Sequence, residues 1–441
     1  MEITMRKVIK IDEKIYYVPS KSLIAEVAGD LKNIDFESWI IDQTDGLQGD
    51  VGCTNCDIHT NQKMSTDLTI ISGTKCNLRC IYCYSEAGEI PELEIDFSKV
   101  KLAIDRVILN AKLRFAITNK KTFATIKFTG GGEPTCNWKI IQATVDYLND
   151  TAMRKWCHLI IQTNGQLTDN MSDSIIKDFD EVVLSCDGFS MIQNLLRPRA
   201  DGEKSWPRID KFLQKLNLDN KINFFLRSTV TNDNVSLMAE ICGYFFEKYD
   251  RIKYIHFEPL GPGGRGKRYA TINLMLFYNN LKKCQEKFGN RVGTSMNIHT
   301  PKSGFCCDSQ SGHSIVLTPT GKFVSCVEES ISDLSGDMSW VISQIDENGL
   351  VKPNEKYISK AQKGDECNSC IAYKYCYGGC PQRIIRDQNN KNISPYGKDL
   401  CKLQKLIIRD QMKELLRLQP KLRINPIENN DYPRIIRYCC I

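Results

Sequence analysis

The sequence predicts an α/β fold: a partial (β/α)6 barrel followed by a loop-rich domain. From residue 66, short apolar runs typical of strands alternate with longer segments in which apolar residues recur at helical spacing. This alternation indicates a parallel sheet covered by helices. Six repeats indicate a partial barrel, with chemistry at the carboxyl ends of its strands. Residues 300–400 break the pattern, because the stretch is loop-like and rich in Gly, Ser, Asn and Cys.

The individual elements follow from this alternation. Ser98 is placed to begin a helix whose apolar residues share one face through Ala111. The later helices are predicted over 139–148, 207–216, 234–248, 273–287 and 397–418. The barrel strands are predicted at Leu68–Ile71, Ala124–Thr129, His158–Ile161, Val182–Ser185, Ile222–Val230 and Ile252–Phe257.

The two ends of the chain differ from the barrel pattern. Residues 7–11 and 14–18 are expected to form short strands, followed by a helix over Lys21–Leu31. The three prolines among the last 22 residues predict an extended tail after the final helix.

Composition is that of a globular protein able to bury a sizeable core. The chain has 441 residues, of which 41% are hydrophobic and 25% charged. No signal pattern or membrane-spanning apolar run is visible, so we expect a cytoplasmic protein without a membrane partner. Much of the net charge of +6 lies in residues 402–437, which hold nine Lys or Arg and four Asp or Glu. Tyr432 is the one aromatic residue there, which is too few for interleaved base stacking, so nucleic acid is not an expected partner.

The chain has twenty cysteines, far more than is usual, and several of them stand at short spacings typical of metal ligands. Cys76, Cys80 and Cys83 are spaced C-x3-C-x2-C directly after the first barrel strand. Three thiolates leave one iron of a [4Fe–4S] cluster without a protein ligand and therefore open to a substrate or cofactor. A structural zinc knuckle is the alternative that this spacing alone leaves open.

Polar motifs follow the next barrel strands. Thr129–Pro134 reads TGGGEP, in which glycines allow close approach of the backbone and Glu133 offers a carboxylate to a cation. Residues 162–165 and 185–188 end the third and fourth strands, and Arg227 on the fifth offers a guanidinium suited to a carboxylate. Each of these sites also has a purely structural interpretation as a turn or a strand-end residue.

A second cysteine array lies in the loop-rich region, where dense, uneven thiol spacings suit iron–sulfur clusters or zinc. Its members are Cys306, Cys307, Cys326, Cys367, Cys370, Cys376, Cys380 and Cys401. The pair Cys53 and Cys56 is either half of a zinc site or two spare thiols, and the roles of Cys439 and Cys440 stay open.

Together the CNLRCIYC loop, the GGEP turn and the second array resemble the radical S-adenosylmethionine (radical SAM) superfamily with a C-terminal SPASM domain. The resemblance covers roughly residues 66–405. It implies a TIM-type partial barrel followed by a SPASM domain organised by two iron–sulfur clusters. It further implies S-adenosylmethionine (SAM) and three [4Fe–4S] clusters, one that binds SAM and two auxiliary.

The resemblance also implies roles for individual residues. Cys76, Cys80 and Cys83 would hold the SAM cluster. The distal auxiliary cluster would take Cys367, Cys370, Cys376 and Cys401, and the proximal one Cys326, Cys380 and one or both of Cys306 and Cys307. The residues expected to contact SAM are Tyr82, Gly131, Gly132, Glu133, Pro134, Thr163, Asn164, Ser185, Asp187 and Arg227.

The implied function is hydrogen abstraction from a ribosomally made precursor peptide, leading to a thioether or carbon–carbon cross-link. Flavodoxin or ferredoxin would supply electrons. The alternative enzyme is an anaerobic sulfatase maturase that forms formylglycine, and a non-catalytic iron–sulfur electron carrier is the alternative of another class. Sulfatase maturases place an acidic base directly after the cysteine matched by Cys326. Here Val327 stands there, and Glu328 is the candidate base.

Four segments are expected. They are residues 1–65, a possible leader-peptide contact; 66–295, the barrel; 296–405, the auxiliary-cluster domain; and 406–441, a basic helix and tail.

Overall fold

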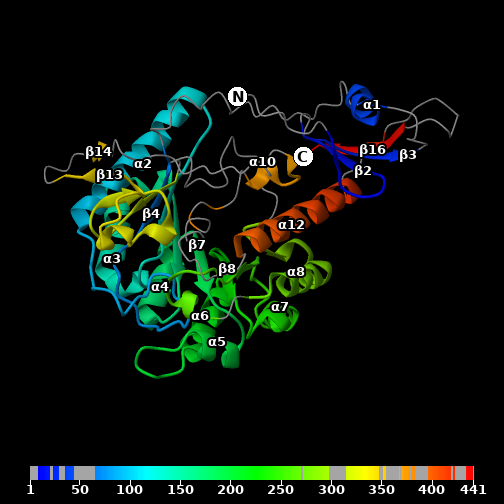
Figure 1. Ribbon diagram of the computed structural model, residues 1–441. Helices are drawn as coiled ribbons and strands as arrows, with labels where there is room; N and C mark the ends of the chain where they lie inside the picture. The colour runs from blue at the N-terminus through cyan, green and yellow to red at the C-terminus, as the bar shows by residue number, and fades with distance from the viewer. Residues whose placement is uncertain are drawn as a thin grey trace.

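The computed structural model of the protein shows a large curved sheet covered by helices, with a smaller sheet beside it (Figure 1). It describes residues 8–19, 23–28, 35–43, 65–269, 272–296, 314–346, 351–353, 367, 369–376, 380, 382, 396–418, 421–422 and 434–440.

The large sheet has eleven strands among the described residues, in the order β10-β9-β8-β7-β6-β5-β4-β11-β12-β13-β14. Strands β4 to β10 run parallel in sequential order, as the alternating pattern predicted. They span β4 Asp67–Ile70, β5 Ala124–Phe128, β6 Cys157–Thr163, β7 Glu181–Ser185, β8 Asn223–Val230, β9 Ile255–Pro259 and β10 Val292–Gly293. The six predicted strands are confirmed, and the two-residue β10 was not predicted because it is too short to carry a periodic signal.

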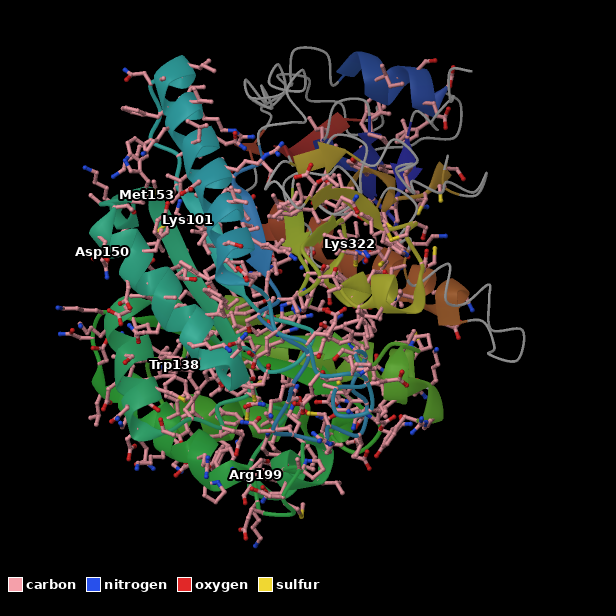
Figure 2. All side chains as sticks on the ribbon, turned by 90° about the vertical axis from the view of Figure 1, so that its left-hand side faces the viewer. Lys101, Trp138, Asp150, Met153, Arg199 and Lys322 are labelled. Carbon is pink, nitrogen blue, oxygen red and sulfur yellow. The ribbon has the colours of Figure 1, made fainter. Side chains whose placement is uncertain are left out.

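Helices from the strand connections pack on the outer face of this sheet. Helix α2 is long and begins after Asp96, whose carboxylate accepts a hydrogen bond from the Ser98 backbone N–H at 2.7 Å. Figure 2 shows α2 and α3 side by side, with Lys101 and Trp138 marking them. The helices are α2 Phe97–Thr118, α3 Trp138–Asp150, α4 Asp169–Asp178, α5 Ser190–Leu196, α6 Trp206–Leu218, α7 Met238–Lys248 and α8 Leu274–Phe288.

The two faces of the barrel strands differ in polarity. In β6, for example, Leu159 and Ile161 are fully buried in the core, whereas His158 and Gln162 on the other face are only half-buried. Successive side chains of a strand point to opposite faces, so one face packs under the helices. The other face is concave and carries polar residues, which makes it available for a binding site.

The region after residue 300 contains more regular structure than its composition predicted. Strand β11 (Ser314–Leu317) pairs in parallel with β4, and β12 (Lys322–Val324), β13 (Val341–Ile345) and β14 (Val351–Pro353) continue the sheet antiparallel. The expectation of a purely loop-like stretch is therefore wrong for these residues. The first of these strands is recruited by β4, a partner that local composition does not reveal.

The small sheet joins the beginning and the end of the chain in the order β1-β2-β3-β16-β15. Strands β1 (Ile9–Lys10) and β2 (Ile15–Val18) confirm the two predicted runs. The predicted helix over Lys21–Leu31 is wrong for residues 23–28, which form strand β3 (Leu23–Ala28). The physical reason is that β3 pairs with β2 on one side and with the C-terminal strand β16 (Arg434–Cys440) on the other.

Two helices cover the faces of this small sheet. Helix α1 (Phe36–Gln43) packs with Tyr16 and Val18, and α12 (Tyr396–Leu418) packs with Tyr17 and Ile24. Figure 1 shows α1 and α12 on either side of β2, β3 and β16. The predicted helix over 397–418 is thus confirmed, and part of the expected tail is strand β16. The four segment boundaries stay predictions.

Several sequence-based interpretations lie outside the described residues. They concern Cys53, Cys56, Cys306 and Cys307. Within the part of the chain that the structure describes, no helix is long and apolar enough to cross a membrane.

Candidate active site

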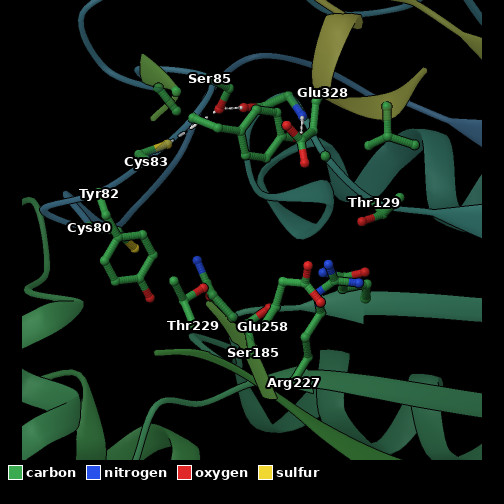
Figure 3. Close-up of a pocket in the computed structure, with 18 of the residues that line it drawn as sticks. Cys80, Tyr82, Cys83, Ser85, Thr129, Ser185, Arg227, Thr229, Glu258 and Glu328 are labelled. Atoms are coloured by element: carbon green, nitrogen blue, oxygen red, sulfur yellow. Dashed lines mark hydrogen bonds between the residues drawn. The ribbon is translucent and has the colours of Figure 1, made fainter. Parts of the chain in front are cut away.

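A cavity of about 430 Å³ lies at the carboxyl ends of the barrel strands. Its walls are the loop with Cys76, Cys80 and Cys83, the glycine turn 130–132, and the ends of β5 to β9. Residues 326–328, which follow β12, close another side. Figure 3 shows side chains from these elements around one space. This is where a parallel α/β barrel is expected to place its chemistry.

The cysteine loop is held by backbone hydrogen bonds to a distant segment, residues 196–200. The Arg79 N–H donates to the Pro198 carbonyl at 2.7 Å, and the Ala200 N–H donates to the Asn77 carbonyl at 3.0 Å. All three thiols of the loop line the cavity. The protein therefore presents them together on a braced backbone.

A buried ion pair between Asp187 and Arg197 also holds the cysteine loop, because both residues contact Tyr82. The Asp187 carboxylate accepts hydrogen bonds from Arg197 Nε at 2.9 Å and Nη2 at 3.1 Å, from the Thr229 N–H at 2.9 Å and from the Tyr82 hydroxyl. The Arg197 guanidinium also lies 5.4 Å from the centre of the Tyr82 ring. Asp187 is fully buried and is not among the lining residues, and its carboxylate holds Tyr82, which does line the cavity.

The glycine turn is tightly apposed to the start of the cysteine loop. Gly131 adopts φ +67°, and a Cβ on Gly132 would lie 2.1 Å from the Lys75 carbonyl oxygen. The Gly132 and Glu133 N–H groups donate to the carbonyls of Gly73 at 3.0 Å and Lys75 at 2.8 Å. The glycines are therefore needed for contact between two backbone segments of the site.

Glu133 is a buried carboxylate with several protein donors. Its Oε1 accepts from Thr163 Oγ1 at 2.6 Å, from Thr135 Oγ1 at 2.8 Å and from the Thr135 N–H at 3.2 Å. Its Oε2 accepts only the Asn164 N–H, at 2.8 Å, among the described residues. Burial raises the pKa of Glu133, and these hydrogen bonds oppose the shift. Because a carboxylate oxygen has two acceptor positions, Oε2 can still accept a hydrogen bond from a ligand ammonium.

The thiols of the loop fit a metal cofactor better than free nucleophiles. Burial raises the pKa of the Cys80 thiol to about 12 and that of Cys76 further still. Such thiols ionise only when a strong cation such as iron compensates the burial. No three His, Cys, Asp or Glu side chains of the described residues converge on a single-ion site. Thiols distributed around a cavity instead suit a cluster, in which each iron takes its own thiolate.

The second cysteine array is brought together in part. Burial raises the pKa of Cys370, and the charges of Cys401 on α12 and of Cys367 act on it in the same direction. Cys370 and Cys376 both pack against the apolar cluster that includes α12 residues. Cys367 and Cys401 thus lie close enough to Cys370 for their charges to act on it, and Cys370 and Cys376 share one apolar cluster with residues of α12. That these four thiols hold a distal cluster stays a prediction.

The remaining predicted contacts are distributed as expected around the cavity. Nine of the ten residues predicted to contact SAM line it, Asp187 being the exception. Ser185 and Arg227 are register partners on neighbouring strands β7 and β8, which suits a shared carboxylate. That these residues bind SAM stays a prediction.

The opposite wall carries Cys326 and Glu328, both of which line the cavity. Tyr84 lies between this wall and the cysteine loop. Burial raises the pKa of Tyr84, and the nearby charges of Cys83, Glu328 and Cys326 raise it further. Glu329 is not among the lining residues, and it accepts a hydrogen bond from Nε2 of the lining residue Gln382 at 2.8 Å. Of the two adjacent glutamates, Glu328 is thus the one that faces the cavity.

Sequence reasoning did not select several lining residues. Lys127 on β5 was not noticed at all, and Gln162 on β6 and Glu258 on β9 were given no role although they lie in strand-end motifs. Each lies on the concave face of its strand, and the period-2 alternation of these strands was the signal that could have found them. Glu258 Oε2 accepts from Ser295 Oγ at 2.7 Å and lies 3.2 Å from His256 Nε2.

Comparison with known proteins gives the family and the fold of this chain. A model of the radical SAM superfamily matches residues 70–237. An uncharacterized protein of Methanocaldococcus jannaschii is 30% identical over 253 residues, which are 57% of this chain and 81% of that protein. A solved structure of native anSMEcpe with bound AdoMet shares the fold, with a TM-score of 0.58 and 18% identity over 80% of this chain and 99% of that chain.

Two relatives have named activities. The serine-type anaerobic sulfatase-maturating enzyme of Klebsiella aerogenes is 24% identical over 354 residues, covering 74% of this chain and 81% of the enzyme. The radical SAM cyclopropyl synthase TigE of Paramaledivibacter caminithermalis is 25% identical over 385 residues, covering 80% and 75%.

Proposed function

Because this chain belongs to the radical SAM superfamily of enzymes, we propose that it is a maturase that modifies a precursor peptide or protein. The observation that carries the proposal is the meeting of two motifs in one cavity. The thiols of Cys76, Cys80 and Cys83 and the glycine turn ending in Glu133 line the same space at the carboxyl ends of the parallel strands. A cluster with one open iron on these thiols and an amino acid moiety bound at Glu133 would then be neighbours, which supports the proposal.

When bound, the cluster and SAM supply reductive cleavage to a 5′-deoxyadenosyl radical that abstracts hydrogen from the substrate. The chain's own residues position the reactants. The three thiolates hold iron, and Oε2 of Glu133 accepts a hydrogen bond from the methionine ammonium of SAM. Ser185 and Arg227 bind its carboxylate. Flavodoxin or ferredoxin is the proposed electron donor, and two auxiliary clusters are the proposed further cofactors.

We propose that the product is a thioether or carbon–carbon cross-link in a peptide. Cys326 lines the cavity, so a proximal cluster bound there with only three protein thiolates would leave an iron for a substrate thiolate. The relative TigE is named a cyclopropyl synthase, and a cyclopropyl ring requires a new carbon–carbon bond. Because this relative matches 80% of the chain, it supports carbon–carbon bond formation as the reaction class.

Formylglycine formation is the second candidate, and one observation favours it. Glu328 lines the cavity next to Val327, so an acidic group is present although the position directly after Cys326 is apolar. This candidate agrees with the sulfatase-maturating relative.

Anaerobic reconstitution tests the proposal. Three [4Fe–4S] clusters predict about 12 irons per chain, and dithionite with SAM should yield 5′-deoxyadenosine. Cys80→Ala should abolish that product. Cys157→Ala, which removes a buried thiol of the core outside the cavity, is the matched control and should retain it. Two to four zinc ions with little iron and no SAM cleavage would contradict the proposal.

The bond formed is tested with two substrates. A sulfatase-derived peptide containing Cys or Ser would give an aldehyde if the chain makes formylglycine. A short peptide encoded beside the chain's own gene should instead lose two hydrogens and resist thiol alkylation or fragmentation across the new link. An aldehyde with the first and no change in the second would replace the cross-linking proposal by the second candidate.

A further inference from the structure

One polar side chain from each of five successive strands lines the cavity. These residues are Lys127, Gln162, Ser185, Arg227 and Glu258, from β5 to β9 in order. All five stand on the inward face of the barrel strands, and we call this set the polar layer. Figure 3 shows Ser185, Arg227 and Glu258 of the layer around the same space.

The polar layer carries two cations without protein partners. Among the described residues, the side chains of Lys127 and Arg227 make no hydrogen bond and no ion pair. By contrast, Arg197 pairs with Asp187 and Arg265 donates to the Ala87 carbonyl at 2.7 Å. Arg227 is exposed toward the cavity, whereas Lys127 is half-buried, and a cation that is partly removed from water normally has an anionic partner. An anionic ligand bound in the cavity would supply the partners that these two cations lack.

Glu258, the anionic member of the polar layer, does not pair with Lys127 or Arg227 among the described residues. Glu258 is turned to Ser295 and His256, and it comes from β9, four strands from Lys127. The charges that act on Lys127 are Arg227 from β8 and Glu181 from β7. Glu181 lies 3.7 Å from His158 Nε2, so it has a partner of its own.

The two cations lie three strands apart around one cavity. Arg227 is the register partner of Ser185, and together they suit one carboxylate. Lys127 lies on β5, the strand that leads into the glycine turn, and the charge of Arg227 acts on it. A Cβ on Gly130 of that turn would lie 3.0 Å from Val327 Cγ1, so β5 ends beside the wall with Cys326 and Glu328. Lys127 can therefore bind a second anion in the cavity that it shares with Arg227.

We propose that Lys127 binds a carboxylate of the peptide substrate in this cavity. This inference rests on the proposed function, because it names the substrate class of the same cavity. The carboxylate comes either from an Asp or Glu side chain or from a free C-terminus. Arg227 and Ser185 take the carboxylate of SAM, so the two anions of the ternary complex have separate partners.

Binding of three capped tetrapeptides to reconstituted, SAM-loaded enzyme without reductant tests the inference. The probes are acetyl-Gly-Ala-Glu-Ala-amide, its Gln counterpart, and the Gln peptide with a free C-terminal carboxylate, measured by ligand-observed NMR. We expect at least one acidic probe to bind about tenfold more tightly than the neutral one, and the tighter acidic probe identifies the source of the carboxylate.

Variants assign the preference to the residue. Lys127→Met should abolish it, and Lys127→Arg should keep it. Lys139→Met removes the same charge at an exposed site outside the cavity and should also keep it. SAM affinity should be the same in the wild type and Lys127→Met, and circular dichroism checks that each variant folds.

Three outcomes would overturn the inference. They are equal binding of acidic and neutral probes to the wild type, an acidic preference that survives Lys127→Met, and a loss of SAM affinity in Lys127→Met. The last outcome would assign Lys127 to SAM. Because no reductant is present, these results are independent of the 5′-deoxyadenosine assay that tests the proposed function.

Discussion

The two cysteine arrays of this protein are supported in different ways. The loop with Cys76, Cys80 and Cys83 is held by backbone hydrogen bonds to residues 196–200 and by the buried pair of Asp187 and Arg197. In the second array, Cys370 and Cys376 lie on or beside a single four-residue helix, α10 (Tyr373–Cys376), which packs against α12. The first array is organised by the protein itself, and we expect the second to depend on its metal.

This difference has a chemical reason. A cluster that binds and cleaves a cofactor needs its open iron in a defined place relative to the substrate, so a preorganised loop is required. A cluster that holds a fold together can contribute its own binding free energy to folding. The two arrays should therefore respond differently when iron is removed and when the protein support is removed.

Removal of iron should have the largest effect, and only on the second array. Metal binding to a folded site contributes on the order of 10 kcal/mol to small metal-organised domains. We expect hydrogen exchange in residues 367–382 to accelerate strongly in the iron-free protein, while β5 to β8 keep their protection. Equal loss of protection in both regions would show that the barrel depends on iron as well.

Loss of the buried ion pair should have the next largest effect, this time on the first array. Arg197→Met leaves the Asp187 carboxylate buried without its bidentate partner, which costs about 3–5 kcal/mol. Urea unfolding of the iron-free protein measures the loss. Lys211→Ala, which removes an exposed partner of Asp169, is the control and should cost at most about 1 kcal/mol. Similar values for the two variants would contradict the bracing role of Arg197.

A methyl group on the glycine turn should disturb the same array from its other side. Gly132→Ala places a Cβ against the Lys75 carbonyl, and overpacking of this kind costs about 1–3 kcal/mol. Because Lys75 directly precedes Cys76, SAM affinity should fall as well.

A matched glycine provides the control for this variant. Gly243 lies inside α7, where an added Cβ would have only the Phe288 ring 4.0 Å away. Gly243→Ala should stabilise the protein by about 0.5–1 kcal/mol through helix propensity. If Gly132→Ala lowers neither the free energy of unfolding in urea nor the affinity for SAM, the close approach of the turn to the loop is not needed for stability or for SAM binding.

The sequence predicted the barrel well because its signal is local. Strands such as Ala124–Thr129 and Val182–Ser185 carry the apolar runs that helices cover, and both appear at the expected places. Strand β3 was taken for a helix because its pairing with β16 joins residues about 400 positions apart, which no local pattern reveals. Strand β11 escaped prediction for the same reason, since β4 recruits it.

The site was predictable where its residues form motifs and not where they lie within strands. The cysteine loop and TGGGEP were found because several functional residues are consecutive. Lys127 stands alone in a strand, so only the alternation of faces places it in the cavity. The motif position of Asp187 predicts a contact with SAM, which stays a prediction, and in the structure its carboxylate binds Arg197 and Tyr82.

The smallest of the expected effects concerns pH and separates the two cations of the polar layer. Burial, assisted by the charge of Arg227, lowers the pKa of Lys127 to about 8, and Glu181 opposes the shift. Lys127 is therefore charged below pH 8 and neutral above it, while Arg227 stays charged because a guanidinium does not deprotonate in proteins. The affinity for an acidic tetrapeptide should fall about tenfold from pH 7 to pH 9, since about a tenth of Lys127 remains protonated at pH 9. Lys127→Arg should remove the pH dependence, and a profile that falls equally in this variant would assign the titration to another group.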